Sequence, residues 1–267
     1  MANIYAGTSG WAYPSWRPAF YPAQLGSAKF LAYYASRLNS VEVNYTFRTL
    51  PTRALLQEWI RATPPHFVFA VKAPQAITHF KRLRGAAGAT AKFIARLEPL
   101  RKARKLGSLL FQLPPNFQCD PPLLAKFLPA IPPHVRAAFE FRHPSWFIEE
   151  VFATLRKSNV ALCLAESEKL ETPDVQTADF NYLRLRKDSY SPAAHKQLAA
   201  KVSGLARQGD VFLYFKHEDT PDGALNAERL QTARKSQLRT GSSPEMVCPF
   251  APTEGSTRRR PLPANPA

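Results

Sequence analysis

Acidic side chains lie inside two segments that otherwise have the composition of buried β-strands. Glu42 lies between Val41 and Val43, and Glu140 lies between Phe139 and Phe141. A charge inside a buried strand is costly unless it is paired or functional. Two carboxylates near cations can differ in pKa, so that one acts as an acid and the other as a base. The sequence therefore predicts carboxylate acid–base chemistry by Glu42 and Glu140, either proton abstraction beside a carbonyl or glycosidic cleavage.

Cations and amides occupy the corresponding places at the ends of other predicted strands. Lys72 ends the third strand and is the third residue that we expect to be catalytic. Arginine offers a bidentate fork to phosphate or carboxylate, which predicts a clamp for an anionic substrate. The residues expected to bind substrate are Trp11, Asn44, His79, Gln112, Arg142, Trp146, Glu166, Arg184, Arg186 and Lys216. For each tryptophan two roles stay open, stacking on a sugar or base and plugging the mouth of a barrel.

Eight strand-like segments alternate with helix-like ones, which predicts a parallel sheet covered by crossover helices. The strand candidates are Ile4–Thr8, Ser40–Tyr45, Phe67–Lys72, Ser108–Leu113, Ala137–Arg142, Val160–Ala165, Asn181–Arg186 and Asp210–Phe215. Eight βα units of this length predict an α/β fold, a (β/α)₈ TIM-barrel-like domain, whose active site lies at the carboxyl ends of the strands. The rival is an open doubly wound sheet. It loses support because Gly7-Thr8-Ser9-Gly10-Trp11 is not a GxGxxG turn.

The sequence predicts one barrel domain at residues 1–233 and a tail at residues 234–267. The tail contains six prolines and the run Arg258-Arg259-Arg260, with little periodicity. Such a composition cannot bury enough apolar surface to fold, so we expect a Pro/Arg-rich disordered tail.

Several long motifs also resemble those of a known family. They are Gly7-Thr8-Ser9-Gly10-Trp11, Val41-Glu42-Val43-Asn44-Tyr45-Thr46-Phe47, Phe69-Ala70-Val71-Lys72 with Thr78-His79, Phe111-Gln112-Leu113-Pro114-Pro115, and Phe139-Glu140-Phe141-Arg142-His143-Pro144-Ser145-Trp146. From about residue 3 to residue 233 the chain is similar to the YecE-like family, a domain of unknown function. The resemblance implies a TIM-barrel-like fold, described as related to sugar isomerases, and no established reaction. The chain has Arg184-Leu185-Arg186-Lys187 where many relatives have Arg-Leu-His-Gly, so its site is more cationic.

The net charge of +16 adds a second hypothesis, a nucleic-acid-binding or nucleic-acid-processing protein that uses its basic surface. Residues 81–105 support it, because nine Lys and Arg residues face only Glu98 there. The alternative for this segment is a solvated outer helix face. The first hypothesis remains an enzyme, an isomerase, lyase or hydrolase, that acts on an anionic sugar-containing or phosphorylated substrate.

Other classes of protein lose support. A metal site would use Glu42, Glu140 and Glu166 with one of His79, His143 or His217, but no local spacing favours it, so we expect no metal and no other cofactor. Cys119, Cys163 and Cys248 lie far apart, which indicates reduced thiols. No apolar run reaches 18 residues and no signal peptide begins the chain, so we expect a cytoplasmic protein without membrane contact. The sequence leaves the oligomeric state open.

Overall fold

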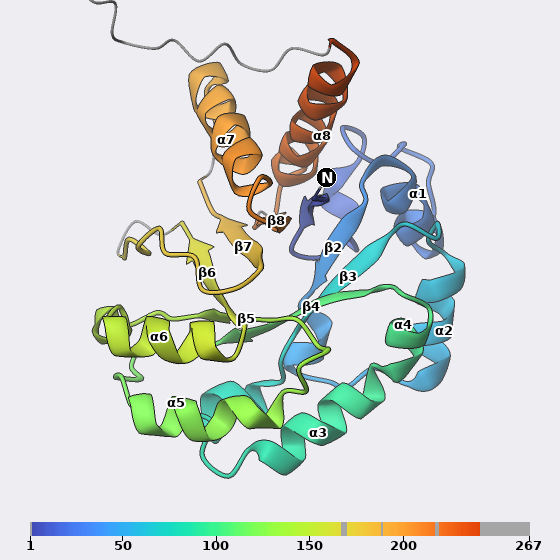
Figure 1. The fold of residues 1–267 in the computed structure, drawn as a ribbon. Helices are drawn as coiled ribbons and strands as arrows, with labels where there is room; N and C mark the ends of the chain where they lie inside the picture. Colours follow the sequence, from blue (N-terminus) through green and yellow to red (C-terminus); the bar gives the residue numbers. More distant parts are fainter. Residues whose placement is uncertain (1, 167–169, 188, 217–218, 241–267) are drawn as a thin grey trace, which may run out of the picture.

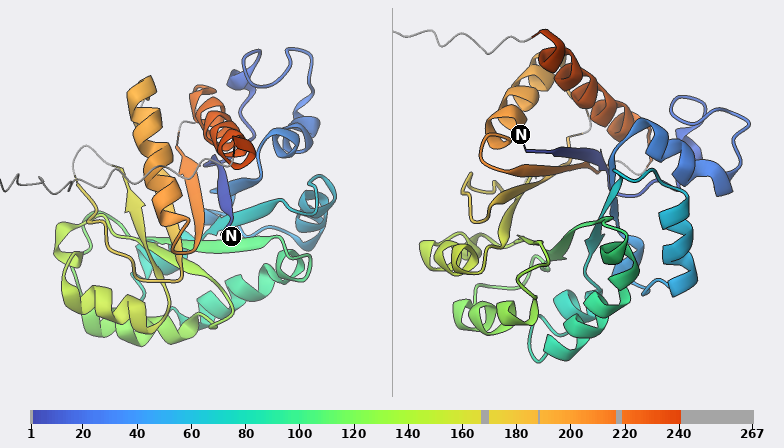
Figure 2. Two further views of the ribbon diagram at one scale, coloured as in Figure 1. Left: turned by 45° about the horizontal axis from the view of Figure 1, so that its top comes forward. Right: turned by 45° about the vertical axis from the view of Figure 1, so that its right-hand side comes forward.

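Eight parallel strands form the centre of the molecule and helices surround them (Figures 1 and 2). The computed structural model describes residues 2–166, 170–187, 189–216 and 219–240. Its strands are β1 (Ile4–Thr8), β2 (Ser40–Val43), β3 (Val68–Lys72), β4 (Leu106–Gln112), β5 (Ala137–Glu140), β6 (Ala161–Ala165), β7 (Phe180–Leu185) and β8 (Asp210–Phe215). They pair in the order β1-β8-β7-β6-β5-β4-β3-β2. This is the predicted barrel, with several strands one or two residues shorter at an end than expected.

The α-helices are α1 (Phe30–Arg37), α2 (Arg53–Arg61), α3 (Ala87–Arg96), α4 (Glu98–Lys102), α5 (Pro121–Phe127), α6 (Glu149–Lys157), α7 (Pro192–Leu205) and α8 (Asp222–Thr240). A side chain caps the start of three of them. Thr52, Asp120 and Ser191 cap α2, α5 and α7 by accepting a hydrogen bond from a backbone N–H three residues on. Pro99 lies in the first turn of α4, directly after α3 has ended, where a proline costs no intrahelical hydrogen bond.

Alternation along each strand divides the core into two layers. On β8, Val211, Leu213 and Phe215 belong to the large cluster between strands and helices. Phe212 and Tyr214 belong to a second cluster with interior residues of the other strands. Because successive strand side chains point to opposite faces, this second cluster fills the barrel.

Side chains close the barrel where β1 meets β2. The only ladder contact there, within the described residues, is a bridge between Ser9 and Glu42. The Tyr34 hydroxyl accepts a hydrogen bond from Thr8 N at 2.8 Å and donates one to Ser40 O at 2.9 Å. Gly7 lies so close to β2 that a Cβ there would stand 1.9 Å from Ser40 O. The contact between β1 and β2, the barrel seam, therefore depends on the Tyr34 hydroxyl and on a residue without a side chain at position 7.

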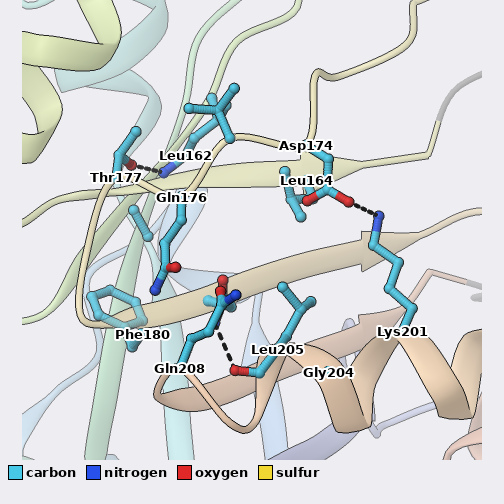
Figure 3. A pocket seen from close by; sticks show the side chains of 13 residues that line it. Leu162, Leu164, Asp174, Gln176, Thr177, Phe180, Lys201, Gly204, Leu205 and Gln208 are labelled. Carbon is cyan, nitrogen blue, oxygen red and sulfur yellow. Dashed lines mark hydrogen bonds and ion pairs between the residues drawn. The ribbon is translucent and has the colours of Figure 1, made fainter. Parts of the chain in front are cut away.

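The crossover from β6 to β7 differs from the predicted eight βα units. Residues 170–179 of this crossover contain no helix. In place of a helix, the extended segment 174–177 and α7 border a cavity of about 370 Å³ (Figure 3). Thr177 holds the segment against β6, since its hydroxyl accepts from Leu162 N and donates to Val160 O at 2.7 Å in each case. Thr172, Pro173 and Asp174 follow one another here, and these residue types favour turns and extended chain over helix.

The last described helix runs past the predicted boundary between barrel and tail. Helix α8 continues to Thr240, so position 234 lies inside a helix. Ala233, Arg234, Lys235, Gln237 and Leu238 all have high helix propensity, which explains the continuation. The rest of the predicted tail, residues 241–267, lies outside the described residues, and so does Cys248. No helix in the described part of the chain has the length and apolarity needed to cross a membrane.

Candidate functional site at the mouth of the barrel

Charged and amide side chains from four strands meet at the carboxyl end of the barrel. Glu42, Gln112, Glu140 and Arg184 are at most 7% exposed, and we call these four residues the buried charge layer. Gln112 and Glu140 are direct partners in the ladder between β4 and β5. Arg184 follows Tyr182, an interior residue, by two positions, so both point into the barrel. The structure thus brings together these four side chains, as the alternation predicted.

Arg184 links the two glutamates of the buried charge layer. Its Nη2 lies 2.7 Å from Glu42 Oε1 and its Nη1 lies 2.5 Å from Glu140 Oε2. Glu42 also accepts hydrogen bonds from the Ser9 and Tyr182 hydroxyls, each at 2.7 Å. Both carboxylates are therefore saturated with donors.

Glu140 has the larger share of positive partners. Arg186 Nη2 donates to its Oε1 at 2.5 Å and Gln112 Nε2 donates to the same oxygen at 2.9 Å. Burial alone would raise the pKa of Glu140, but Arg184 and Arg186 outweigh burial and lower the pKa to about 2. Glu140 is 1% exposed and Glu42 is 0% exposed. Glu140 is therefore ionised, and both carboxylates are enclosed, which is unlike the accessible acid–base pair that the sequence suggested.

Lys72 lies beside this layer and is partly exposed. It ends β3 and its side chain is partly buried. Its Nζ lies 4.2 Å from the centre of the Phe47 ring and makes no hydrogen bond or ion pair with a described residue. Burial, and then the nearby Arg184, lowers the pKa of Lys72 to about 8, against the opposing pull of Glu42 and Glu140.

Further cations surround Lys72 at the mouth, by which we mean the carboxyl ends of the strands and the loops after them. Arg142 and Lys216 are exposed just beyond β5 and β8. The His79 ring packs edge-on against Phe47 at 4.9 Å, the same ring that Lys72 covers. Burial lowers the pKa of His79, and Lys72 and Arg142 lower it further. His79 is thus neutral at pH 7 and able to accept a proton.

Glu166 has a different neighbourhood from the one expected of a substrate ligand. Its Oε2 accepts hydrogen bonds from the backbone N–H of Arg186 at 3.0 Å and from the Tyr190 hydroxyl at 2.5 Å. Lys187 Nζ lies 3.7 Å from the other oxygen. Glu166 therefore anchors the chain that leaves β7, and in doing so it positions Arg186.

The other residues predicted to bind substrate differ in how exposed their side chains are: Trp146 is buried, and Trp11 and Asn44 are partly exposed. Trp146 is 0% exposed, stacks on Phe141 at 4.7 Å and donates from Nε1 to Phe117 O at 2.7 Å. Of the two roles left open for Trp146, this burial favours packing over stacking on a ligand, because the ring and its N–H are enclosed in the core. Trp11 is partly exposed and contacts Trp59 edge-on at 5.4 Å. Asn44 Oδ1 is enclosed without a hydrogen-bond partner, so it is an acceptor that a ligand could satisfy.

Three residues of the site were missed or set aside in the sequence. Ser9 and Tyr182 hold Glu42, and Tyr190 holds Glu166. The alternation of Phe180, Tyr182 and Arg184 along one strand was the available signal for Tyr182. The described residues contain no group of three or more His, Cys, Asp or Glu side chains placed to hold a metal ion. His217 lies outside the described residues.

The fold and the mouth define a TIM-barrel protein with a charged layer at the carboxyl ends of its strands. The chain belongs to the family described as Protein of unknown function DUF72, whose model matches residues 5–247. UPF0759 protein YunF of Bacillus subtilis (strain 168) is 32% identical over 152 residues, which are 54% of this chain and 52% of YunF. The chain thus spans about half the length of this curated relative.

Solved structures of the same family share the fold. A DUF72 family protein from Thermotoga maritima has a TM-score of 0.79 and 28% identity, and the match covers 87% of this chain and 99% of that one. A DUF72 family protein from Enterococcus faecalis has a TM-score of 0.71 and 18% identity, covering 88% of this chain and 98% of that one. The second likeness shows the fold alone. The expected family and barrel are confirmed.

Proposed function

We propose that this protein is an enzyme that acts on an anionic small molecule, sugar-containing or phosphorylated, at the mouth of the barrel. The observation that carries this proposal is a contrast in exposure. The acidic side chains of the site, Glu42 and Glu140, are closed to solvent and bound to arginines. Arg142 and Lys216 are exposed and Lys72 is partly exposed, so the charge that a substrate meets is positive. A group of cations on one part of the surface attracts an anionic ligand.

The same contrast assigns the chemical roles. A general acid or base must reach the reacting atoms, and the carboxylates of Glu42 and Glu140 are enclosed. Their role is therefore to hold Arg184 and Arg186 in place rather than to transfer protons. Lys72 and His79 then carry the proton transfers, because each has a neutral form near pH 7. Glycosidic cleavage needs two reachable carboxylates. The proposal is therefore an isomerase or lyase that moves a proton beside a carbonyl.

Thermal unfolding with and without ligands tests the proposal. Phosphosugars, sugar acids, nucleotides and short oligonucleotides are added in turn, because a ligand of the folded state raises the melting temperature. We expect a shift with a phosphosugar or sugar acid that Arg142→Ala and Lys72→Met abolish. Lys126→Ala, at an exposed lysine of α5, is the matched control and should keep the shift. A shift that survives in Arg142→Ala, or no shift with any small anion, would contradict the proposal.

A second candidate function rests on a different place in the fold. A groove of about 950 Å³ runs between α2 and the pair α3 and α4. The exposed cations Arg53, Lys92, Arg96 and Lys102 line it, and its one acidic residue, Glu98, is already paired with Arg101 at 2.6 Å. Such a groove suits the phosphates of a single-stranded nucleic acid.

The basic segment 81–105 is less continuous than its sequence suggests. Lys105 is 4% exposed, and its ammonium donates to Thr63 O at 3.1 Å, so it cannot contact phosphate. Arg84 is paired with Asp120 at 3.1 Å. The groove residues remain, and the test is oligonucleotide binding at several salt concentrations. Arg96→Ala with Lys102→Ala should reduce the salt slope by about 2 if each contacts one phosphate. Binding that Arg142→Ala weakens instead would place nucleic acid at the mouth and contradict this candidate.

A further inference from the structure

Lys72 differs from the other lysines whose surroundings the structure describes, because its side chain is partly buried at the end of β3 and has no acidic partner among the described residues. Lys105 is also buried, but three oxygen acceptors bind its ammonium. The two carboxylates nearest to Lys72, Glu42 and Glu140, have their oxygens occupied by Arg184, Arg186, Ser9, Tyr182 and Gln112. Its Nζ contacts the face of the Phe47 ring at 4.2 Å. An amine in this position is partly desolvated and has its lone pair available to a ligand.

The neighbours of Lys72 supply the other groups that amine chemistry needs. His79 shares the Phe47 ring with Lys72, and a bond of 2.9 Å between its Nδ1 and the Thr78 hydroxyl fixes the imidazole. Arg142 and Lys216 are close enough to affect the charge states of His79 and Lys72 respectively. A nucleophile, a neutral imidazole and anion-binding cations therefore lie around one place at the mouth.

We propose that Lys72 is a nucleophile that forms an imine with the carbonyl carbon of an aldehyde or ketone substrate carrying an anionic group. The proposal deepens the proposed function, on which it rests, by naming the substrate class. Lysine reacts in this way when it is desolvated or placed beside another cation, and Lys72 meets both conditions through Phe47 and Arg184.

The step balances without an oxidant or reductant. The Nζ lone pair attacks the carbonyl carbon, the C=O electron pair moves to oxygen, and a proton moves from the nitrogen to that oxygen, which gives a neutral carbinolamine. The hydroxyl group takes a proton from solvent and leaves as water while the nitrogen lone pair forms the C=N bond, which gives a protonated imine. Its positive nitrogen withdraws electrons, so a neutral His79 can remove a proton from the adjacent carbon at lower cost. The protonated His79 then returns that proton to a carbon of the substrate, and addition of water to the protonated imine releases the carbonyl product, the free amine and one proton.

The protonation state at neutral pH supports this role. At pH 7 about a tenth of an amine with a pKa near 8 is unprotonated, against about one part in 3,000 for an ordinary lysine. Even with the lower nucleophilicity of a weaker base, we expect Lys72 to react at least about tenfold faster than an exposed lysine such as Lys126. The rate should rise with pH and level off above about pH 8.

Reductive trapping tests the proposal. The full chain is mixed with glyceraldehyde 3-phosphate, and sodium borohydride reduces any imine to a stable secondary amine. Peptide mass spectrometry then measures the labelling of Lys72 relative to Lys126 from pH 6 to pH 9. Unphosphorylated glyceraldehyde is the matched control, because it carries the same aldehyde without the anionic group. Lys72→Arg and Lys72→Met should lose the adduct while keeping a cooperative melting transition.

Each outcome decides between the two proposals. Preferential labelling of Lys72 by the phosphorylated aldehyde, reduced by Arg142→Ala, supports the imine. Equal labelling of Lys72 and Lys126 overturns it. If small anions raise the melting temperature through Arg142 while Lys72 stays unlabelled, the imine fails and the proposed function stands. If glyceraldehyde labels Lys72 as fast as its phosphate does and no anion shifts the melting temperature, the proposed function fails.

Discussion

Replacing Arg184 with methionine removes the cation that two enclosed carboxylates share. Methionine has a similar length and no charge, so the change isolates the loss of the guanidinium. Glu140 keeps Arg186 and Gln112. Glu42 keeps only the neutral donors Ser9 and Tyr182 among the described residues. Removing one partner of a buried ion pair costs about 3–5 kcal/mol, since the other charge stays buried. The low pKa of Glu140 is consistent with this size, since a drop from 4.5 to about 2 corresponds to about 3 kcal/mol.

Urea unfolding followed by circular dichroism measures the effect. We expect Arg184→Met to lower the free energy of unfolding by about 3–5 kcal/mol with little change in the denaturant slope. Arg156→Met is the matched control. Its pair with Glu149 has the same length, 2.5 Å, but the two side chains are 44% and 74% exposed. Loss of that surface pair should cost less than about 1 kcal/mol.

A second substitution identifies the cause of the loss. Glu42→Gln should be less destabilising in Arg184→Met than in the wild type, because the glutamine removes the charge that the first change left unpaired. Two results would refute the reasoning. One is an Arg184→Met loss no larger than the Arg156→Met loss. The other is strict additivity of Glu42→Gln and Arg184→Met, which would mean that the two side chains do not interact.

Three further predictions concern acid stability and the barrel seam. Folding lowers the pKa of Glu140, so the ionised carboxylate stabilises the folded protein above about pH 4.5. This contribution is lost as the pH falls toward about 2. Across this range, the free energy of unfolding in urea should depend less on pH in Glu140→Gln than in the wild type. Tyr34→Phe leaves Thr8 N and Ser40 O without the tyrosine hydroxyl and should lower the free energy of unfolding in urea by about 1–3 kcal/mol. Tyr33→Phe, at a partly exposed tyrosine, should lower it less. Gly7→Ala places a Cβ 1.9 Å from Ser40 O and should lower the melting temperature. Gly88→Ala in α3 has open space around the new Cβ and should raise the melting temperature. The opposite order would show that the seam is not tightly closed.

The positions of the site residues followed from strand periodicity. In β2, β5 and β7 the charged residues alternate with aliphatic and aromatic ones, and a buried parallel strand permits this only when one face looks into the barrel. Glu42, Glu140 and Arg184 were therefore predictable as neighbours at one end. The family motifs pointed to the same end, because each contains or directly follows a strand end.

The pairing of those residues was not predictable from the sequence. Whether Glu140 faces solvent or Arg184 depends on the register between β4, β5 and β7, which no local pattern contains. For the same reason the sequence assigned acid–base roles to carboxylates that the structure encloses. Trp146 is a similar case, since its contact with Phe141 and Phe117 depends on how two loops fold over each other. The sequence analysis expected a helix after β6, where residues 170–179 contain none, because the repeat of βα units suggested regularity.

The buried charge layer, together with Arg186, explains why Lys72 has no counter-ion among the described residues. Two carboxylates face two guanidiniums, from Arg184 and Arg186, so the floor beneath Lys72 is close to neutral. If either arginine were absent, a free carboxylate would attract the ammonium and raise its pKa. The two arginines thus keep Lys72 from pairing with a carboxylate of this layer, and their positions on β7 and directly after it make this arrangement possible. In Arg184→Met the pKa of Lys72 should therefore rise, and trapping at pH 7 should slow even where the protein stays folded.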